Sequence, residues 1–127
     1  MKTIIAISSG GIAGALARYF LSILIQRRIQ TAFPYATLAV NVSGCFFMGF
    51  IINIFISNPG FSPSLKLFFI TGFAGAFTTF STFSHETLSL LMSRNFKAAL
   101  LNVLLSNFIG LAAVFAGAAV AKTLGAV

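Results

Sequence analysis

The chain has 127 residues, of which 58% are hydrophobic and only 7% are charged, and its mean hydropathy is +1.02. This composition excludes a soluble globular protein, and with it a soluble enzyme. The formal net charge of +7 does not indicate a nucleic-acid partner, because the lysines and arginines are scattered among the predicted loops. We therefore expect an all-α integral membrane protein whose basic loops face anionic lipid headgroups or an anionic solute.

Four hydrophobic segments are long enough to cross a bilayer, since about 20 apolar residues span its core. They cover approximately residues 3–25, 36–56, 65–91 and 98–120, so that residues 1–127 form a single four-span domain. The connections between them are short and rich in turn residues, which predicts antiparallel neighbouring helices. The single cysteine, Cys45, lies in an apolar run and is interpreted as a packing residue.

Lysine and arginine residues near the span ends are almost balanced between the two sides of the membrane. The side of the N-terminus holds Lys2, Lys66 and Lys122, and the opposite side holds Arg27, Arg28, Arg94 and Lys97. These residues set the orientation of a membrane protein. So small a bias predicts dual topology, in which two oppositely inserted copies pair as an antiparallel homodimer.

Small residues on the first and last spans favour close contact between helices. Gly10 and Gly14 form a GxxxG step, and Ala113, Gly117 and Ala121 continue the pattern on the last span. These positions serve either the dimer or packing within one monomer.

The third segment contains TGFAGAFTTFSTFSHE, residues 71–86, which is unusually polar for membrane depth. Gly72 and Gly75, followed by a run of hydroxyl residues, predict a helix that is broken in the middle of the membrane. Broken helices expose backbone carbonyls that bind a hard cation and amides that attract an anion. The alternative is an unbroken helix whose hydroxyls bond back to their own turn.

Phe80 and Phe83 are three residues apart and so share one face of a helix. The ordinary interpretation is packing or contact with lipid. The more specific interpretation is that the electropositive edges of the two rings lie against a dehydrated anion.

Several polar residues lie at the same end of the bundle when each span is counted at about 1.5 Å per residue. They are Arg18, Asn41, Glu86 and Asn102, with Ser106 deeper and nearer the predicted break. Arg18 either pairs with Glu86 or extends to the interface, and Asn41 is either a link between helices or a pore donor. Many donors with a single acid favour an anion pathway over a cation pathway.

Three motifs, GGIAGALARY, LAVNVSG and above all GAFTTFSTFS, resemble the Fluc family of fluoride channels, also called the CrcB family. The resemblance covers essentially the whole chain in length, span number and motif order. It implies an antiparallel, dual-topology dimer with two fluoride pores lined by both subunits. Such a channel lets cytoplasmic fluoride leave passively across the bacterial inner membrane and so gives fluoride resistance.

The resemblance also implies roles for individual residues. A structural sodium ion would be held by the backbone carbonyls of Gly75 and Thr78. The matching pore residues are Asn41, Phe80, Ser81, Thr82 and Phe83, with Ser106 on the fourth span. The fourth span departs from the family, because Gly110 and Val114 follow Ser106 where a track of hydroxyls is expected.

Two other functions fit a short four-span protein. Small multidrug transporters also have dual topology, but they depend on a glutamate in the first helix with tryptophan around it. This chain has Arg18 there and no tryptophan. A membrane assembly subunit without transport of its own is the second alternative.

Overall fold

The computed structural model describes residues 1–124, and throughout this range its regular structure is helical. Three spans are single helices: α1 (Lys2–Arg28), α2 (Tyr35–Ser57) and α6 (Phe96–Thr123). The third span consists of α3 (Pro63–Leu67), the π-helical segment η1 (Phe68–Ala74), α4 (Gly75–Phe77) and α5 (Phe80–Met92).

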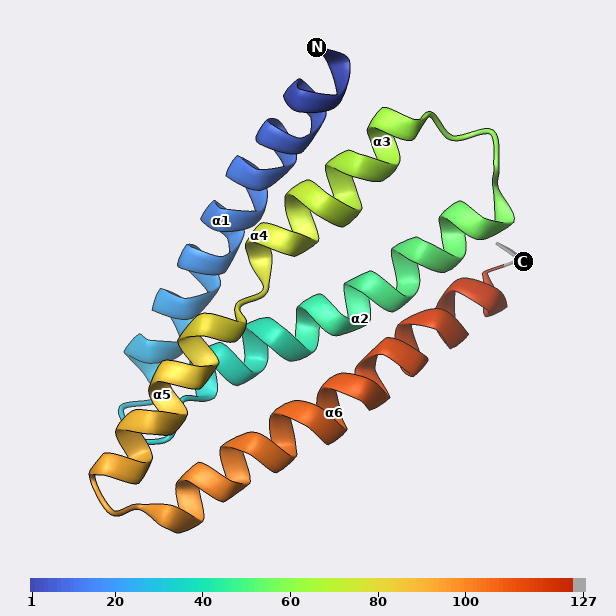
Figure 1. Ribbon diagram of the computed structural model, residues 1–127. Helices are drawn as coiled ribbons and strands as arrows, with labels where there is room; N and C mark the ends of the chain where they lie inside the picture. Colours follow the sequence, from blue (N-terminus) through green and yellow to red (C-terminus); the bar gives the residue numbers. More distant parts are fainter. Residues whose placement is uncertain (125–127) are drawn as a thin grey trace.

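The predicted count of four spans is confirmed. Four helical stretches are long and apolar enough to cross a membrane, and each extends about one to three residues beyond its predicted hydrophobic run at both ends. The extra residues include the basic residues Lys2, Arg27 and Arg28, whose long side chains can reach the headgroups from a helix end. Successive spans run in opposite directions, as the short connections predict (Figure 1).

The connections end and restart helices through residues suited to that role. Ser62 caps α3 by accepting a hydrogen bond from the Leu65 N–H at 3.2 Å, and Pro63 occupies the first helical turn. Asn95 caps α6 in the same way, with its side chain 3.3 Å from the Ala98 N–H. These caps satisfy backbone donors that lipid could not satisfy.

Helix α1 packs along η1, and glycine makes this contact possible. A Cβ atom on Gly10 would collide with the carbonyl oxygen of Phe68, and one on Gly14 with that of Phe73. Both glycines are buried. The GxxxG step of the first span therefore serves packing within one chain, which decides between its two predicted roles.

Helix α2 packs along α6 in the most extensive helix contact of the chain. A Cβ on Gly49 would meet the carbonyl oxygen of Val114, and one on Gly117 would meet that of Phe46. The small residue Gly117 of the last span is thus also used inside the monomer.

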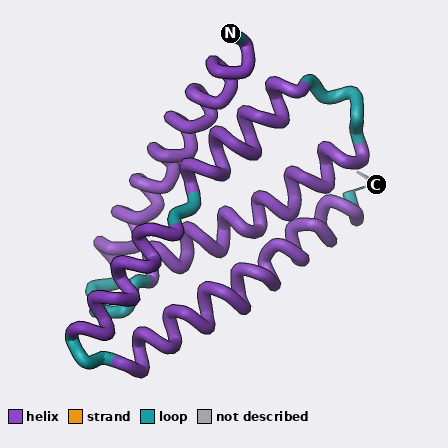
Figure 2. The backbone as a smooth tube through the Cα atoms, in the orientation of Figure 1, coloured by secondary structure: helices purple, strands orange, loops and turns teal. Residues whose placement is uncertain are grey.

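The backbone leaves the helical conformation between α4 and α5. Thr78 has φ −81° and ψ 158°, and Thr79 has φ −148° and ψ 117°, so both residues are extended. Figure 2 shows this loop between two helical parts of the third span. Helix α5 therefore continues the third span, but the helical pattern of backbone hydrogen bonds is interrupted between α4 and α5.

Candidate functional site

The extended segment is held by the side chain of Asn41 on α2. Asn41 Oδ1 accepts a hydrogen bond from the Thr79 N–H at 2.8 Å, and Asn41 Nδ2 donates to the Thr79 carbonyl at 3.0 Å. The amide therefore pairs with both backbone groups of Thr79, as a neighbouring strand would. Room for the extended segment comes from Gly44, one turn further along α2, where a Cβ would collide with Thr78.

Thr79 also starts α5. Its hydroxyl accepts a hydrogen bond from the Thr82 N–H at 3.2 Å, which is the geometry of an N-cap. The Thr78 hydroxyl bonds back to the Ala74 carbonyl at 3.0 Å. Back-bonding, which the sequence suggested as the alternative to a break, thus occurs at Thr78, one of the two extended residues.

A cavity of about 320 Å³ lies between α2, α5 and α6, next to the extended segment. We call it the phenylalanine cavity. It brings together four of the predicted pore residues: Asn41, Phe80, Phe83 and Ser106. The rest of its wall is formed by Gly44, Cys45, Met48, Thr78, Thr79, Asn107 and Val114.

The two aromatic rings of this cavity lie close together. The centroids of Phe80 and Phe83 are 5.6 Å apart, and the ring planes are inclined by 43°. Phe83 is half-buried, whereas Phe80 is 79% exposed. Phe80 therefore lies at the open side of the cavity, where this chain alone does not cover it.

Ser106 contributes a hydroxyl without a partner. Its Oγ is buried and makes no hydrogen bond to the rest of residues 1–124. A buried hydroxyl of this kind is costly unless something else binds it. Ser106 lines the phenylalanine cavity, so this unpartnered hydroxyl belongs to a residue of the cavity wall.

The remaining two predicted pore residues lie elsewhere. Ser81 is exposed, with its hydroxyl 3.3 Å from that of Thr79. Thr82 lines a different cavity of about 340 Å³, which also contains Arg18 and Glu86 and which we call the arginine cavity. The structure thus places Thr82 in a different cavity from the phenylalanine rings, whereas Thr79 lines both cavities.

Arg18 and Glu86 line the same cavity but do not form the predicted ion pair. Glu86 Oε1 accepts a hydrogen bond from the hydroxyl of Thr37 at 2.9 Å. Its second oxygen, Oε2, is buried and has no hydrogen-bond partner among the described residues. Arg18 lines the same cavity from α1. Counting residues along the spans therefore predicted that the two residues lie at a similar depth, but it could not predict how each helix is rotated about its axis.

Thr37 was not identified from the sequence, although a signal for it existed. It lies four residues before Asn41 and so on the same face of α2. The structure puts Thr37 at the level of Glu86 and Asn41 about one turn deeper, beside Thr79. The sequence interpretation placed Asn41 and Glu86 at the same end of the bundle, and the structure separates them by about this one turn.

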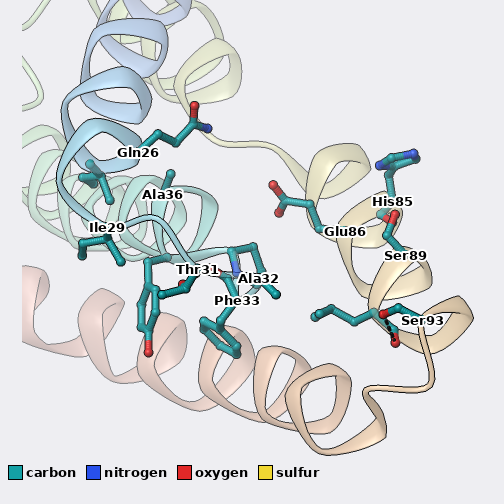
Figure 3. A pocket seen from close by; sticks show the side chains of 14 residues that line it. Gln26, Ile29, Thr31, Ala32, Phe33, Ala36, His85, Glu86, Ser89 and Ser93 are labelled. Carbon is teal, nitrogen blue, oxygen red and sulfur yellow. Dashed lines mark hydrogen bonds between the residues drawn. The ribbon is translucent and has the colours of Figure 1, made fainter.

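A third cavity, of about 500 Å³, lies beside the loop between α1 and α2, and we call it the loop cavity. Figure 3 shows Glu86 projecting from α5 toward the end of α1 and this loop. The wall includes several polar side chains: Gln26, Thr31, His85, Glu86, Ser89 and Ser93. Glu86 lines both the loop cavity and the arginine cavity, so its carboxyl group lies where the two adjoin.

The fold and these cavities define a class of protein: a multi-pass membrane protein with polar groups gathered inside its bundle, as in channels and transporters. The chain belongs to the CrcB family, because the family model described as CrcB-like protein, Camphor Resistance (CrcB), matches residues 5–118. This confirms the family that the three motifs predicted.

Curated relatives agree with this assignment over nearly the full chain. A fluoride-specific ion channel FluC from Flavobacterium psychrophilum is 43% identical over 124 residues, covering 98% of this chain and 100% of the relative. One from Roseiflexus sp. (strain RS-1) is 46% identical over 121 residues, covering 95% and 98%. One from Maridesulfovibrio salexigens is 38% identical over 122 residues, covering 96% and 97%. These relatives are named as ion channels and not as enzymes.

Proposed function

We propose that the protein is a fluoride-selective channel that lets cytoplasmic fluoride leave the cell passively across the bacterial inner membrane. The observation that carries the proposal is the phenylalanine cavity, which gathers Asn41, Phe83 and the unpartnered hydroxyl of Ser106 from three helices. The names of the relatives support fluoride as the ion.

The chemistry of the cavity suits a small, strongly hydrated anion. Fluoride must exchange its water for donors, since an unpaired charge in an apolar medium is very costly. Asn41 Nδ2 carries two N–H groups, and Thr79 uses one of them. The second N–H, the Ser106 hydroxyl and the ring edge of Phe83 are the available donors. Ring edges are weak donors, and weak binding lets an ion leave as well as enter.

Two copies of the chain would be needed to close this pathway. The walls of the cavity come from α2, α5, α6 and the extended segment, and Phe80 at its edge is 79% exposed. An antiparallel homodimer supplies the missing wall and produces two equivalent pores. The balanced basic residues at the span ends support dual topology.

Gly75 and Thr78 fit the structural sodium ion that the family implies. In an unbroken helix their carbonyls would accept hydrogen bonds from the N–H groups of Thr79 and Thr82. Those N–H groups instead donate to Asn41 Oδ1 at 2.8 Å and to the Thr79 hydroxyl at 3.2 Å. Both carbonyls therefore keep lone pairs for a hard cation, which would add a fixed positive charge near the two pores.

Arg18 and Glu86 belong to the vestibule in this proposal. The positive side chain of Arg18 attracts anions into the arginine cavity, where the Thr82 hydroxyl is a further donor. Glu86 is held by Thr37 on the loop side of this cavity.

The proposal is tested by fluoride release from proteoliposomes. Vesicles loaded with potassium fluoride are treated with valinomycin, so that potassium can follow, and external fluoride is recorded with an electrode. We expect rapid release of fluoride and no release of chloride from matched vesicles. Equal release of both halides would refute selectivity, and no release of either would instead favour an assembly subunit without transport.

A further inference from the structure

Two consecutive hydrogen bonds connect α6 to the backbone of Phe83. Asn102 Nδ2 donates to the Thr87 hydroxyl at 2.9 Å, and that hydroxyl donates to the Phe83 carbonyl at 2.8 Å. Asn102 is 1% exposed, although the helix that carries it is largely exposed. A fully buried amide that reaches the neighbouring helix costs free energy unless its bonds are made, so its position is well defined.

Helix α5 depends on such contacts more than the other helices do. It is uncoupled from α4 by the extended residues Thr78 and Thr79, and its packing against α6 is far less extensive than that of α2. Polar side chains hold it instead. Asn41 binds the backbone just before its first turn, and Asn102 reaches its second half through Thr87.

Asn102 lies about one helical turn from the phenylalanine cavity but does not line it. Ser106, four residues later on α6, lies on the same helix face and does line the cavity. The bond from Asn102 therefore sets the spacing between the Ser106 hydroxyl on α6 and the Phe83 ring on α5. Thr87 has only one hydroxyl proton, which Phe83 uses, so Thr87 is not an anion donor.

We propose that Asn102 and Thr87 are positioning residues that hold the Phe83 ring edge at a fixed distance from Ser106 across the phenylalanine cavity. The inference rests on the proposed function, because only a channel gives that distance a consequence for transport. On the α2 side, α5 is restrained by the bonds of Asn41 to Thr79 and by the bond from Thr37 to Glu86, whereas the bond from Asn102 is the polar contact that restrains it on the α6 side.

A double-mutant cycle in reconstituted full-length protein tests the effect on transport. Asn102→Leu removes the bond between the two helices, and Thr87→Val removes that bond together with the bond to the Phe83 carbonyl; both variants keep the branched skeleton of the native side chain. We expect each to slow fluoride release about two- to tenfold, the range that loss of the shared bond between Asn102 and Thr87 gives. Thr87→Ser, which keeps the hydroxyl, should restore the rate. In a Phe83→Ile background neither substitution should slow release further, because the group that they position is gone.

Ser9→Ala is the matched control for the loss of a hydroxyl. The Ser9 hydroxyl bonds to the carbonyl four residues earlier at 2.7 Å, as that of Thr87 does, but no second helix binds it. We expect its release rate to equal that of the wild type. Full additivity of Asn102→Leu with Phe83→Ile would overturn the proposal, since it would assign Asn102 an effect that does not pass through the ring.

A spectroscopic measurement separates this inference from the proposed function. The ¹⁹F NMR signal of 4-fluorophenylalanine in place of Phe83 reports the surroundings of the ring in detergent-solubilised protein. We expect Asn102→Leu and Thr87→Val to shift or broaden this signal, and Ser9→Ala to leave it unchanged. An unchanged signal in both variants would refute positioning. If the wild type released no fluoride, the proposed function would fail. The ¹⁹F signal would still show whether Asn102 and Thr87 position the Phe83 ring.

Discussion

Asn41→Leu is the substitution that tests most directly how the extended segment is held. Leucine has the same branched arrangement of side-chain heavy atoms as asparagine but can neither donate to nor accept from Thr79. The substitution therefore removes two hydrogen bonds, of 2.8 and 3.0 Å, and leaves the N–H and carbonyl of Thr79 without a partner. Unpaired backbone groups are most costly where lipid or protein excludes water.

The magnitude follows from these two bonds. Hydrogen bonds between helices in membrane proteins average ~0.6 kcal/mol and reach ~1.7 kcal/mol. Two of them predict that Asn41→Leu lowers the free energy of unfolding by about 1 to 3 kcal/mol. Fluoride release should slow as well, because the same amide supplies a donor to the phenylalanine cavity.

The assay is reversible unfolding in mixed micelles with increasing SDS, followed by circular dichroism at one protein concentration. Asn53→Leu is the control on the same helix. The Asn53 amide donates to the Gly49 carbonyl at 2.8 Å, four residues earlier, and so holds no second segment. We expect this control to change the free energy of unfolding by less than about 0.5 kcal/mol, as is usual away from packed or buried polar features. Equal values for the two variants would refute the role assigned to Asn41.

Three further predictions concern the pore and the ion. Phe83→Ile should slow fluoride release without dissociating the proposed dimer, because it deletes a ring edge at modest loss of volume; an unchanged release rate would mean that Phe83 serves packing only. Ser106→Ala should slow release while the free energy of unfolding stays equal or rises by about 1 kcal/mol, since the lost hydroxyl had no partner. A reduced stability in SDS titration would contradict this. Replacing sodium by N-methylglucamine throughout purification should reduce release, measured in the same electrode assay; full activity without sodium would argue against a cation at Gly75 and Thr78.

Hydropathy alone predicted the four spans, and the motifs alone predicted the family. Both are local properties of the chain. A bilayer selects any long apolar helix whatever its neighbours are, so composition and length suffice. The phenylalanine pair was likewise predictable, because residues three apart share a helix face.

Partnerships between helices were predicted less well. Counting residues along each span placed Arg18 and Glu86 at one end, and both do line one cavity. The carboxyl oxygen nevertheless binds Thr37, because contact depends on the rotation of each helix and not on depth alone. The roles of Thr87 and Asn102 had no sequence signal beyond polarity.

The sequence by itself determined that this is a membrane protein of four spans with a polar, glycine-containing third span. The tertiary structure alone decided which polar groups are satisfied by one another and which have no partner among the described residues. Asn41 binds the Thr79 backbone, whereas the Ser106 hydroxyl is buried without a partner among the described residues. The physical reason is that a hydrogen bond needs two groups within about 3 Å, and only the packed arrangement of helices brings distant residues that close.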